Sequence, residues 1–204
     1  MDSSDNPNQL ASSVARSPFF RLSAELRNQV YRLVLVIEDS GSEEFYEDSV
    51  IVDASNGIPE PALLLTNKII RSEAADIFHY ENDFCCYVEN FDPAPVLLLQ
   101  SKLKVSFSEH PTNVAIERRG NSFSWDNLVA WLHKCHRREC EGLLSHDDMY
   151  GASGYDFYAE RYLLHGLFTV AVNCPEIQSS TLDTIIGSMY LPLVVINRGW
   201  YKGN

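Results

Sequence analysis

The chain has 204 residues, of which 45% are hydrophobic, and its formal net charge at pH 7 is −12. This length and apolar content suffice for one domain with a buried core. The acidic excess lies mainly in the first hundred residues and would repel phosphate backbones, which argues against nucleic-acid binding. No uninterrupted apolar run reaches the roughly 18 residues of a membrane span, so no membrane association is expected.

The first sixteen residues are polar and rich in Ser and Asn. They lack the basic start and apolar stretch of a secretory signal, so residues 1–16 are expected to be a disordered tail and the protein intracellular, in cytoplasm or nucleus. The five cysteines are odd in number and show no disulfide spacing, which fits that location. Residues 17–204 are expected to form a single domain.

Two amphipathic helices are predicted in the first half of the chain. Ser23 is suited to cap the first, and Leu26, Val30, Leu33 and Val34 form an apolar stripe that we expect to face the core. The second should run from about residue 61 to residue 80, because Pro suits the first helical turn and apolar residues recur at helical spacing. A short strand near residues 50–52 is expected between them.

The second half of the chain contains segments with the apolar spacing of helices and segments with the alternation of strands. Strands are expected at 84–88, 103–107, 114–116 and 191–197, and helices at 125–135 after a Ser124 cap, at 163–174 and at 182–189. These elements do not follow regular βαβ alternation, which predicts the α+β class. The expected architecture is about five helices packed with a small, mainly antiparallel sheet.

Two segments in the first half of the chain match a known sequence pattern. "FFRLSAELRNQVYRLVL" and "PALLLTNKIIRSEAADIFHYENDFCCYV" are similar to the helices of the largely uncharacterised F-box-like proteins with paired Glu-x-Arg motifs. The matching positions are Leu22, Glu25, Leu26, Arg27, Val30, Tyr31, Leu35, Leu64, Ile70, Arg71, Glu73, Ala74, Phe78, Glu81, Asn82 and Phe84. The resemblance implies a non-enzymatic protein-interaction module, used for substrate recognition or as an adaptor, with a Skp-type adaptor as partner and no cofactor.

Charged residues of the two helices are placed to pair. Glu25 and Arg27 are two positions apart and point to different sides of their helix. We expect Glu25 to meet Arg71 and Arg27 to meet Glu73 or Asp76, which would set how the helices cross. Four unrelated surface charges are the alternative.

An aromatic group at the start of the first helix is the candidate partner-binding surface. It consists of three aromatic residues and one leucine, Phe19, Phe20, Leu22 and Tyr31. We expect this group to contact a partner because aromatic side chains supply anchoring area at interfaces. The alternative is that Phe19 and Phe20 pack into the domain's own core.

Residues that could perform chemistry are few. His136 and Cys140 are four apart and could share a metal, but the spacing of the surrounding Cys and His residues does not match a zinc motif, so no metal is expected. No nucleophile–base arrangement and no phosphate-binding glycine loop occurs. Two basic clusters, Arg118–Arg119 and Lys134 with Arg137–Arg138, are expected to be solvated. The alternative function is a small enzyme or ligand-binding protein with a pocket between the C-terminal helices.

Overall fold

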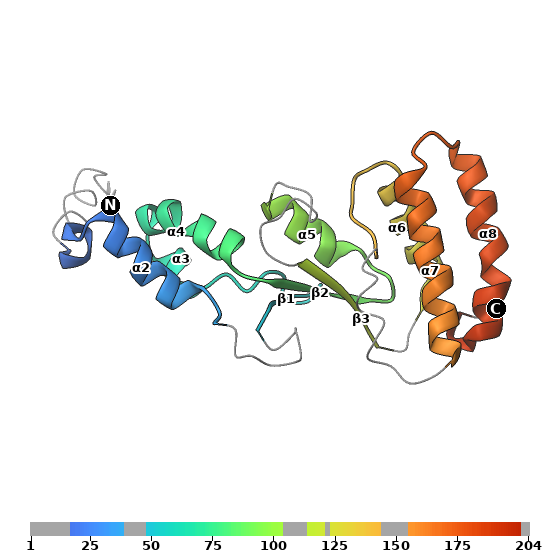
Figure 1. The fold of residues 1–204 in the computed structure, drawn as a ribbon, viewed down its shortest axis with the longest axis horizontal. Helices are drawn as coiled ribbons and strands as arrows, with labels where there is room; N and C mark the ends of the chain where they lie inside the picture. Colours follow the sequence, from blue (N-terminus) through green and yellow to red (C-terminus); the bar gives the residue numbers. More distant parts are fainter. Residues whose placement is uncertain (1–16, 39–47, 104–113, 121–122, 144–154, 201–204) are drawn as a thin grey trace, which may run out of the picture. The chain divides into compact units, whose positions relative to one another are not determined.

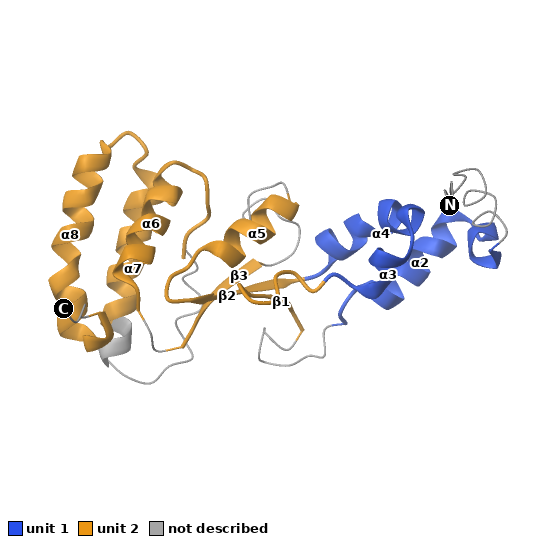
Figure 2. Ribbon diagram, turned by 180° about the vertical axis from the view of Figure 1, so that it is seen from behind, with its two compact units in different colours: residues 1–39, 60–82 blue, residues 40–59, 83–204 orange. Residues whose placement is uncertain are grey.

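The computed structural model describes residues 17–38, 48–103, 114–120, 123–143 and 155–200, with the side chains of 155–158 excepted. These residues belong to two compact units (Figure 2). Unit 1 comprises residues 1–39 and 60–82, and unit 2 comprises residues 40–59 and 83–204. The predicted tail, residues 1–16, lies outside the described residues.

Unit 1 consists of helices (Figure 1). Its elements are the 3-10 helix η1 (Pro18–Arg21) and the α-helices α2 (Ala24–Leu35), α3 (Ala62–Thr66) and α4 (Lys68–Glu81). The predicted cap of α2 is confirmed, because the Ser23 side chain accepts a hydrogen bond from the backbone N–H of Leu26.

The second predicted helix is divided in two. Asn67 has an extended backbone and separates α3 from α4, and its side chain accepts a hydrogen bond from the Ile69 N–H at 2.7 Å. An Asn side chain that caps the following helix can end the preceding one, because it offers the backbone a partner outside the helical ladder. A single helix over residues 61–80 was therefore the wrong expectation.

Unit 2 contains a three-stranded sheet in the order β1 (Val50–Val52), β2 (Phe84–Glu89) and β3 (Val114–Arg119). Both strand pairs are parallel, with Val50 opposite Phe84 and Phe84 opposite Val114. The described residues are thus α+β with seven α-helices, and the expected mainly antiparallel sheet was wrong.

The connections explain the parallel arrangement. Parallel neighbours need a long crossover between them, and helices α3 and α4 lie between β1 and β2 in the chain. Helix α5 (Ala94–Leu103) lies between β2 and β3 and packs against β2 and β1. A strand was predicted at 103–107, but Leu103 is the last residue of α5 and residues 104–107 lie outside the described part.

Three helices and a short 3-10 turn complete unit 2. Helices α6 (Trp125–His136), α7 (Tyr155–Asn173) and α8 (Ser179–Ile196) pack in sequence, and η4 (Arg198–Trp200) follows (Figure 1). Ser124 caps α6 as predicted, by accepting from the Asn127 N–H. A terminal strand at 191–197 was the wrong expectation, because residues 191–196 continue α8.

Helix α8 is apolar on average, although its first turns contain Ser and Thr residues and Asp183. Its 18 residues have a mean hydropathy of 1.4, and by length and composition it could cross a membrane. Leu182, Ile186 and Leu193 are buried within unit 2, whereas the other side chains of the helix are exposed or half-buried. The helix continues through the β-branched residues near its end, although their local preference favoured a strand.

A buried carboxylate ties the end of the chain to the sheet in unit 2. Glu160 of α7, only 3% exposed, accepts hydrogen bonds from Arg118 at 2.8 Å, Trp200 Nε1 at 3.0 Å and Asn197 at 3.1 Å. The Arg118 guanidinium also lies 4.8 Å from the centroid of the Phe123 ring. The expectation that Arg118 is a solvated surface charge was therefore wrong.

Candidate protein-interaction surface

Helix α2 carries two apolar faces, and the one predicted to be inward is exposed. Tyr31 and Leu35 are buried, at 0% and 3% exposure. The predicted stripe is on the outside, and we call it the α2 stripe; the exposed fractions of its side chains are 48% for Leu26, 38% for Val30, 78% for Leu33 and 60% for Val34. The periodicity was correctly recognised, but the buried side of the helix was not.

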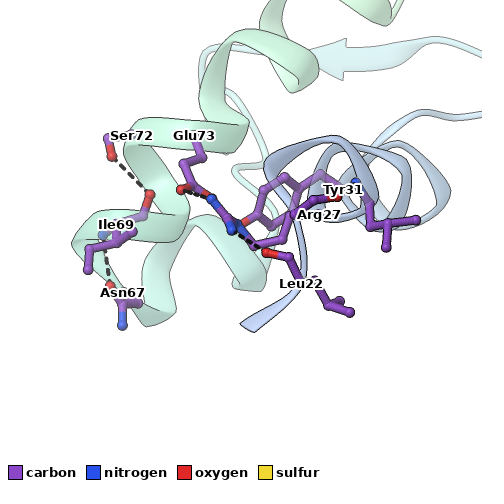
Figure 3. Close-up of polar contacts among 9 residues, drawn as sticks. Leu22, Arg27, Tyr31, Asn67, Ile69, Ser72 and Glu73 are labelled. Carbon is purple, nitrogen blue, oxygen red and sulfur yellow. Dashed lines mark hydrogen bonds and ion pairs between the residues drawn. The ribbon is translucent and has the colours of Figure 1, made fainter. Parts of the chain in front are cut away.

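The buried face is held by a carboxylate of α4 (Figure 3). Arg27 donates from Nε and Nη2 to the two oxygens of Glu73, at 2.9 and 2.6 Å, and the Tyr31 hydroxyl donates to Oε2 at 2.9 Å. Tyr31 can therefore be buried without leaving its hydroxyl unpaired. The structure brings Arg27 and Glu73 together as the sequence predicted.

The pKa values in this cluster follow from the contacts. The hydrogen bonds from Arg27 are the main reason why the pKa of Glu73 lies below its ordinary value. Burial, followed by the hydrogen bond to Glu73, raises the pKa of Tyr31 to about 12. At neutral pH Glu73 is therefore ionised and Tyr31 is neutral, so both groups keep the protonation states that their bonds require.

The same arginine fixes the segment that precedes α2. Arg27 Nη1 donates to the Leu22 carbonyl at 2.8 Å (Figure 3). The Phe19 ring meets the rings of Phe20 and Tyr31, each with centroids 5.5 Å apart and in an edge-on arrangement. Arg27 and Tyr31 of α2 thus contact both α4 and the segment that precedes α2.

These contacts change the predicted partner-binding group. Tyr31 is fully buried and cannot touch a partner, because its ring and hydroxyl are occupied by Phe19 and Glu73. Phe19 and Phe20 are half-buried, and Leu22 is 37% exposed. Of the four predicted residues, only Leu22 belongs to the clearly exposed apolar surface.

The second predicted ion pair is not formed among the described residues. Arg71 donates from Nε to the Leu64 carbonyl at 2.7 Å, which joins α4 to α3, and Glu25 is exposed at the start of α2. Arg71 therefore serves the helix break at Asn67 rather than the crossing of α2 and α4.

A second clamp joins the other ends of α2 and α4, and the charge-pair prediction did not include it. Arg32 donates to both oxygens of Glu81, at 2.7 and 2.8 Å. The buried Asn82 side chain donates to the carbonyls of Leu35 and Phe78 and accepts from the Ile37 N–H. The signal available in the sequence was the Glu81–Asn82 pair at the end of α4.

The two weak metal candidates serve other contacts. His136 Nε2 lies 3.1 Å from the Ile177 carbonyl, and the Cys140 thiol donates to the Glu141 carbonyl at 3.3 Å. Among the described residues no group of three or more His, Cys, Asp and Glu side chains is placed to hold a metal ion. Burial, above all, raises the pKa of the nearby Cys86 thiol and keeps it neutral.

Unit 1 thus presents an aliphatic stripe on one side of a helix whose other side is fastened by hydrogen-bonded charges. Such an exposed row of large apolar side chains is typical of a surface that another molecule covers. Comparison of the chain with protein-family models, with curated proteins and with solved structures found no match.

Proposed function

We propose that the protein is an intracellular protein-interaction module of F-box-like type, which binds its partner through the α2 stripe. The observation that carries the proposal is the exposure of Leu26, Val30, Leu33 and Val34 on one side of a single helix. Aliphatic side chains at helical spacing are the anchors by which a helix occupies an apolar groove of another protein.

The attachment of α2 to α4 favours partner binding through the α2 stripe. The bonds of Glu73 to Arg27 and Tyr31, and of Glu81 to Arg32, fasten α2 to α4 on the side away from the stripe. A helix that is already ordered loses little conformational entropy when it binds, so more of the contact energy appears as affinity. The two clamps therefore support a preorganised binding surface.

The resemblance in the sequence names the partner class. An F-box-like module binds a Skp-type adaptor, and the α2 stripe lies within the first of the two segments that carry the resemblance. The partner surface should be an apolar groove, because the stripe offers no charge of its own. The role would be that of a substrate-recognition or adaptor protein without catalytic activity.

The test is a calorimetric titration of the full chain with a purified fungal Skp-type adaptor. Leu33→Glu places a charge in the middle of the stripe and should weaken binding by more than about tenfold, as at interface hot spots. Leu191→Glu is the matched control, because Leu191 is a 69% exposed leucine of α8, outside the stripe. It should bind like the wild type.

The outcomes separate the two parts of the proposal. If the adaptor does not bind the wild type, the Skp-type role is wrong. If the adaptor binds the wild type and Leu33→Glu equally well, the stripe is not the interface. Circular dichroism of both variants must match the wild type for either conclusion.

A further inference from the structure

A cavity of about 400 Å³ lies in unit 2 where the parallel strands end. Asp53 directly follows β1, Glu89 is the last residue of β2, and Arg119 is the last residue of β3. All three residues line the cavity, together with Tyr87 and, from α6, Asn127. Ligands of open parallel sheets bind outside the carboxyl ends of the strands, and the cavity lies at this edge of the sheet.

The strand register places the charged side chains of this cavity next to each other. Glu89 is opposite Arg119, and Tyr87 is opposite Glu117. Side chains alternate between the faces of a strand, so Tyr87, Glu89 and Arg119 project from the same face. The opposite charges of Glu89 and Arg119 therefore lie on neighbouring strands at the carboxyl end of the sheet.

The two acidic side chains of the adjoining loops are already used by the protein. Asp53 accepts hydrogen bonds from Ser55 and Asn56, and the Asn56 bonds are the main reason why its pKa falls to about 2. Asp92 accepts from the Ala94 N–H at the start of α5. These carboxylates contribute negative charge, but their oxygens are engaged in local turns.

Glu89 and Arg119 differ from them. Within the described part of the chain no hydrogen bond or ion pair of the Glu89 carboxylate is found, although Arg119 is its neighbour in the sheet. The Arg119 guanidinium lies instead over the Tyr87 ring, 3.3 Å from its centroid. An adjacent acid and base that do not pair with each other can each meet the opposite charge of one small molecule.

We propose that this cavity binds a small zwitterion of the amino-acid type, with its ammonium group at Glu89 and its carboxylate at Arg119. The excess of acidic side chains around the cavity favours the ammonium end, and Arg119 fixes the orientation through a planar pair of N–H donors. The Asn127 amide donates from Nδ2 to the Asn90 carbonyl, and its oxygen would be a further acceptor for the ammonium group. The volume is within the range of small-molecule sites and accommodates a whole amino acid.

The experiment titrates the full chain with each of the twenty free L-amino acids by calorimetry. At least one should bind with a 1:1 stoichiometry and a Kd on the order of 1 mM or below. For that amino acid, the N-acetyl derivative lacks the ammonium charge and the amide derivative lacks the carboxylate. Each should bind at least about tenfold more weakly, because each loses one charge-assisted contact.

Two variants assign the ends. Arg119→Gln should weaken binding of the free amino acid about tenfold and leave the binding of its amide unchanged. Glu89→Gln should weaken binding of the free amino acid and leave the binding of its N-acetyl derivative unchanged. Arg137→Gln is the matched control, since Arg137 is an exposed arginine of the same unit that pairs with Glu139. It should bind like the wild type.

Either of two results would overturn the proposal: no binding of any of the twenty amino acids, or equal binding of the free amino acid by wild type and both variants. If the circular dichroism of Arg119→Gln differs from that of the wild type, the test rests on Glu89→Gln alone. Glu89 is exposed, so its substitution should not disturb folding. Leu33→Glu should leave amino-acid binding unchanged, and this control separates the zwitterion site from the α2 stripe.

Discussion

Glu73 joins the first half of α2 to α4. Its two oxygens accept three hydrogen bonds, two from Arg27 and one from Tyr31. A half-buried carboxylate with three donors is stabilised in its ionised form, and it holds a tyrosine ring in the core that would otherwise carry an unpaired hydroxyl.

Titration of Glu73 provides a first prediction. The pKa of Glu73 in the folded protein lies below its ordinary value of 4.5, mainly because of the Arg27 hydrogen bonds. Unfolding therefore takes up a proton in acid, so this stabilisation is complete above about pH 4.5 and is lost as the pH falls through the folded pKa. Carboxyl ¹³C NMR should show this low pKa, and Arg27→Gln should raise it; an unchanged pKa in the variant would contradict the assigned cause.

Removal of the Tyr31 hydroxyl provides a second prediction. Tyr31→Phe keeps the ring but leaves Glu73 with one donor fewer, so the free energy of unfolding should fall by about 1 kcal/mol. Urea unfolding followed by circular dichroism measures the change. Tyr162→Phe removes a hydroxyl from a 58% exposed residue and should change nothing measurable; equal effects of the two variants would argue against the Tyr31–Glu73 bond.

At the scale of elements, the relation of α2 to α4 is defined at both ends. The Glu73 cluster holds the start of α2, and Asn82 holds its end by joining Leu35 and Ile37 to the last turn of α4. Helix ends leave backbone groups without partners, and one buried amide side chain supplies them for both helices. The same arrangement turns the α2 stripe outward.

Asn82→Ala should be among the most destabilising changes in unit 1. It leaves the Leu35 and Phe78 carbonyls and the Ile37 N–H without their partner, at a cost of about 2 kcal/mol. Hydrogen exchange in α2 and α4 should become about 30-fold faster, as read by mass spectrometry. Asn173→Ala, at the exposed end of α7, is the control and should leave exchange unchanged.

At the scale of the whole molecule, the described residues form two compact units, each with a hydrogen-bonded carboxylate at its centre, half-buried in unit 1 and buried in unit 2. In unit 1 this centre is Glu73, and in unit 2 it is Glu160 with its bonds to Arg118, Asn197 and Trp200. The Glu160 centre joins strand β3, helix α7 and the end of the chain, which are far apart in sequence.

Loss of the Glu160 carboxylate should destabilise unit 2. Glu160→Ala leaves the largely buried Arg118 guanidinium and the Trp200 N–H unpaired, which should lower the free energy of unfolding by about 3 kcal/mol. Tryptophan fluorescence reports on this unit, because all three tryptophans, Trp125, Trp131 and Trp200, lie in it. Glu139→Ala removes an exposed carboxylate and should have little effect; a comparable loss in both variants would refute the special role of Glu160.

Sequence alone predicted the features that depend on neighbours in the chain. The Ser23 and Ser124 caps, the α6 and α7 helices and the spacing of the α2 stripe were recognised because capping and helical periodicity are local. The Arg27–Glu73 pair was anticipated as one of several alternatives, since residue spacing limits which charges can face a second helix.

Only the tertiary structure decided which side of α2 is buried, how the strands pair and where the cavity lies. Tyr31 can lie in the core because its hydroxyl donates a hydrogen bond to Glu73, which is 42 residues away in the chain. The sheet is parallel because helical segments connect β1 to β2 and β2 to β3. Glu89 lies opposite Arg119 only because of the register between β2 and β3. These outcomes depend on contacts between distant segments, whose free energy a local pattern of apolar and polar residues does not contain.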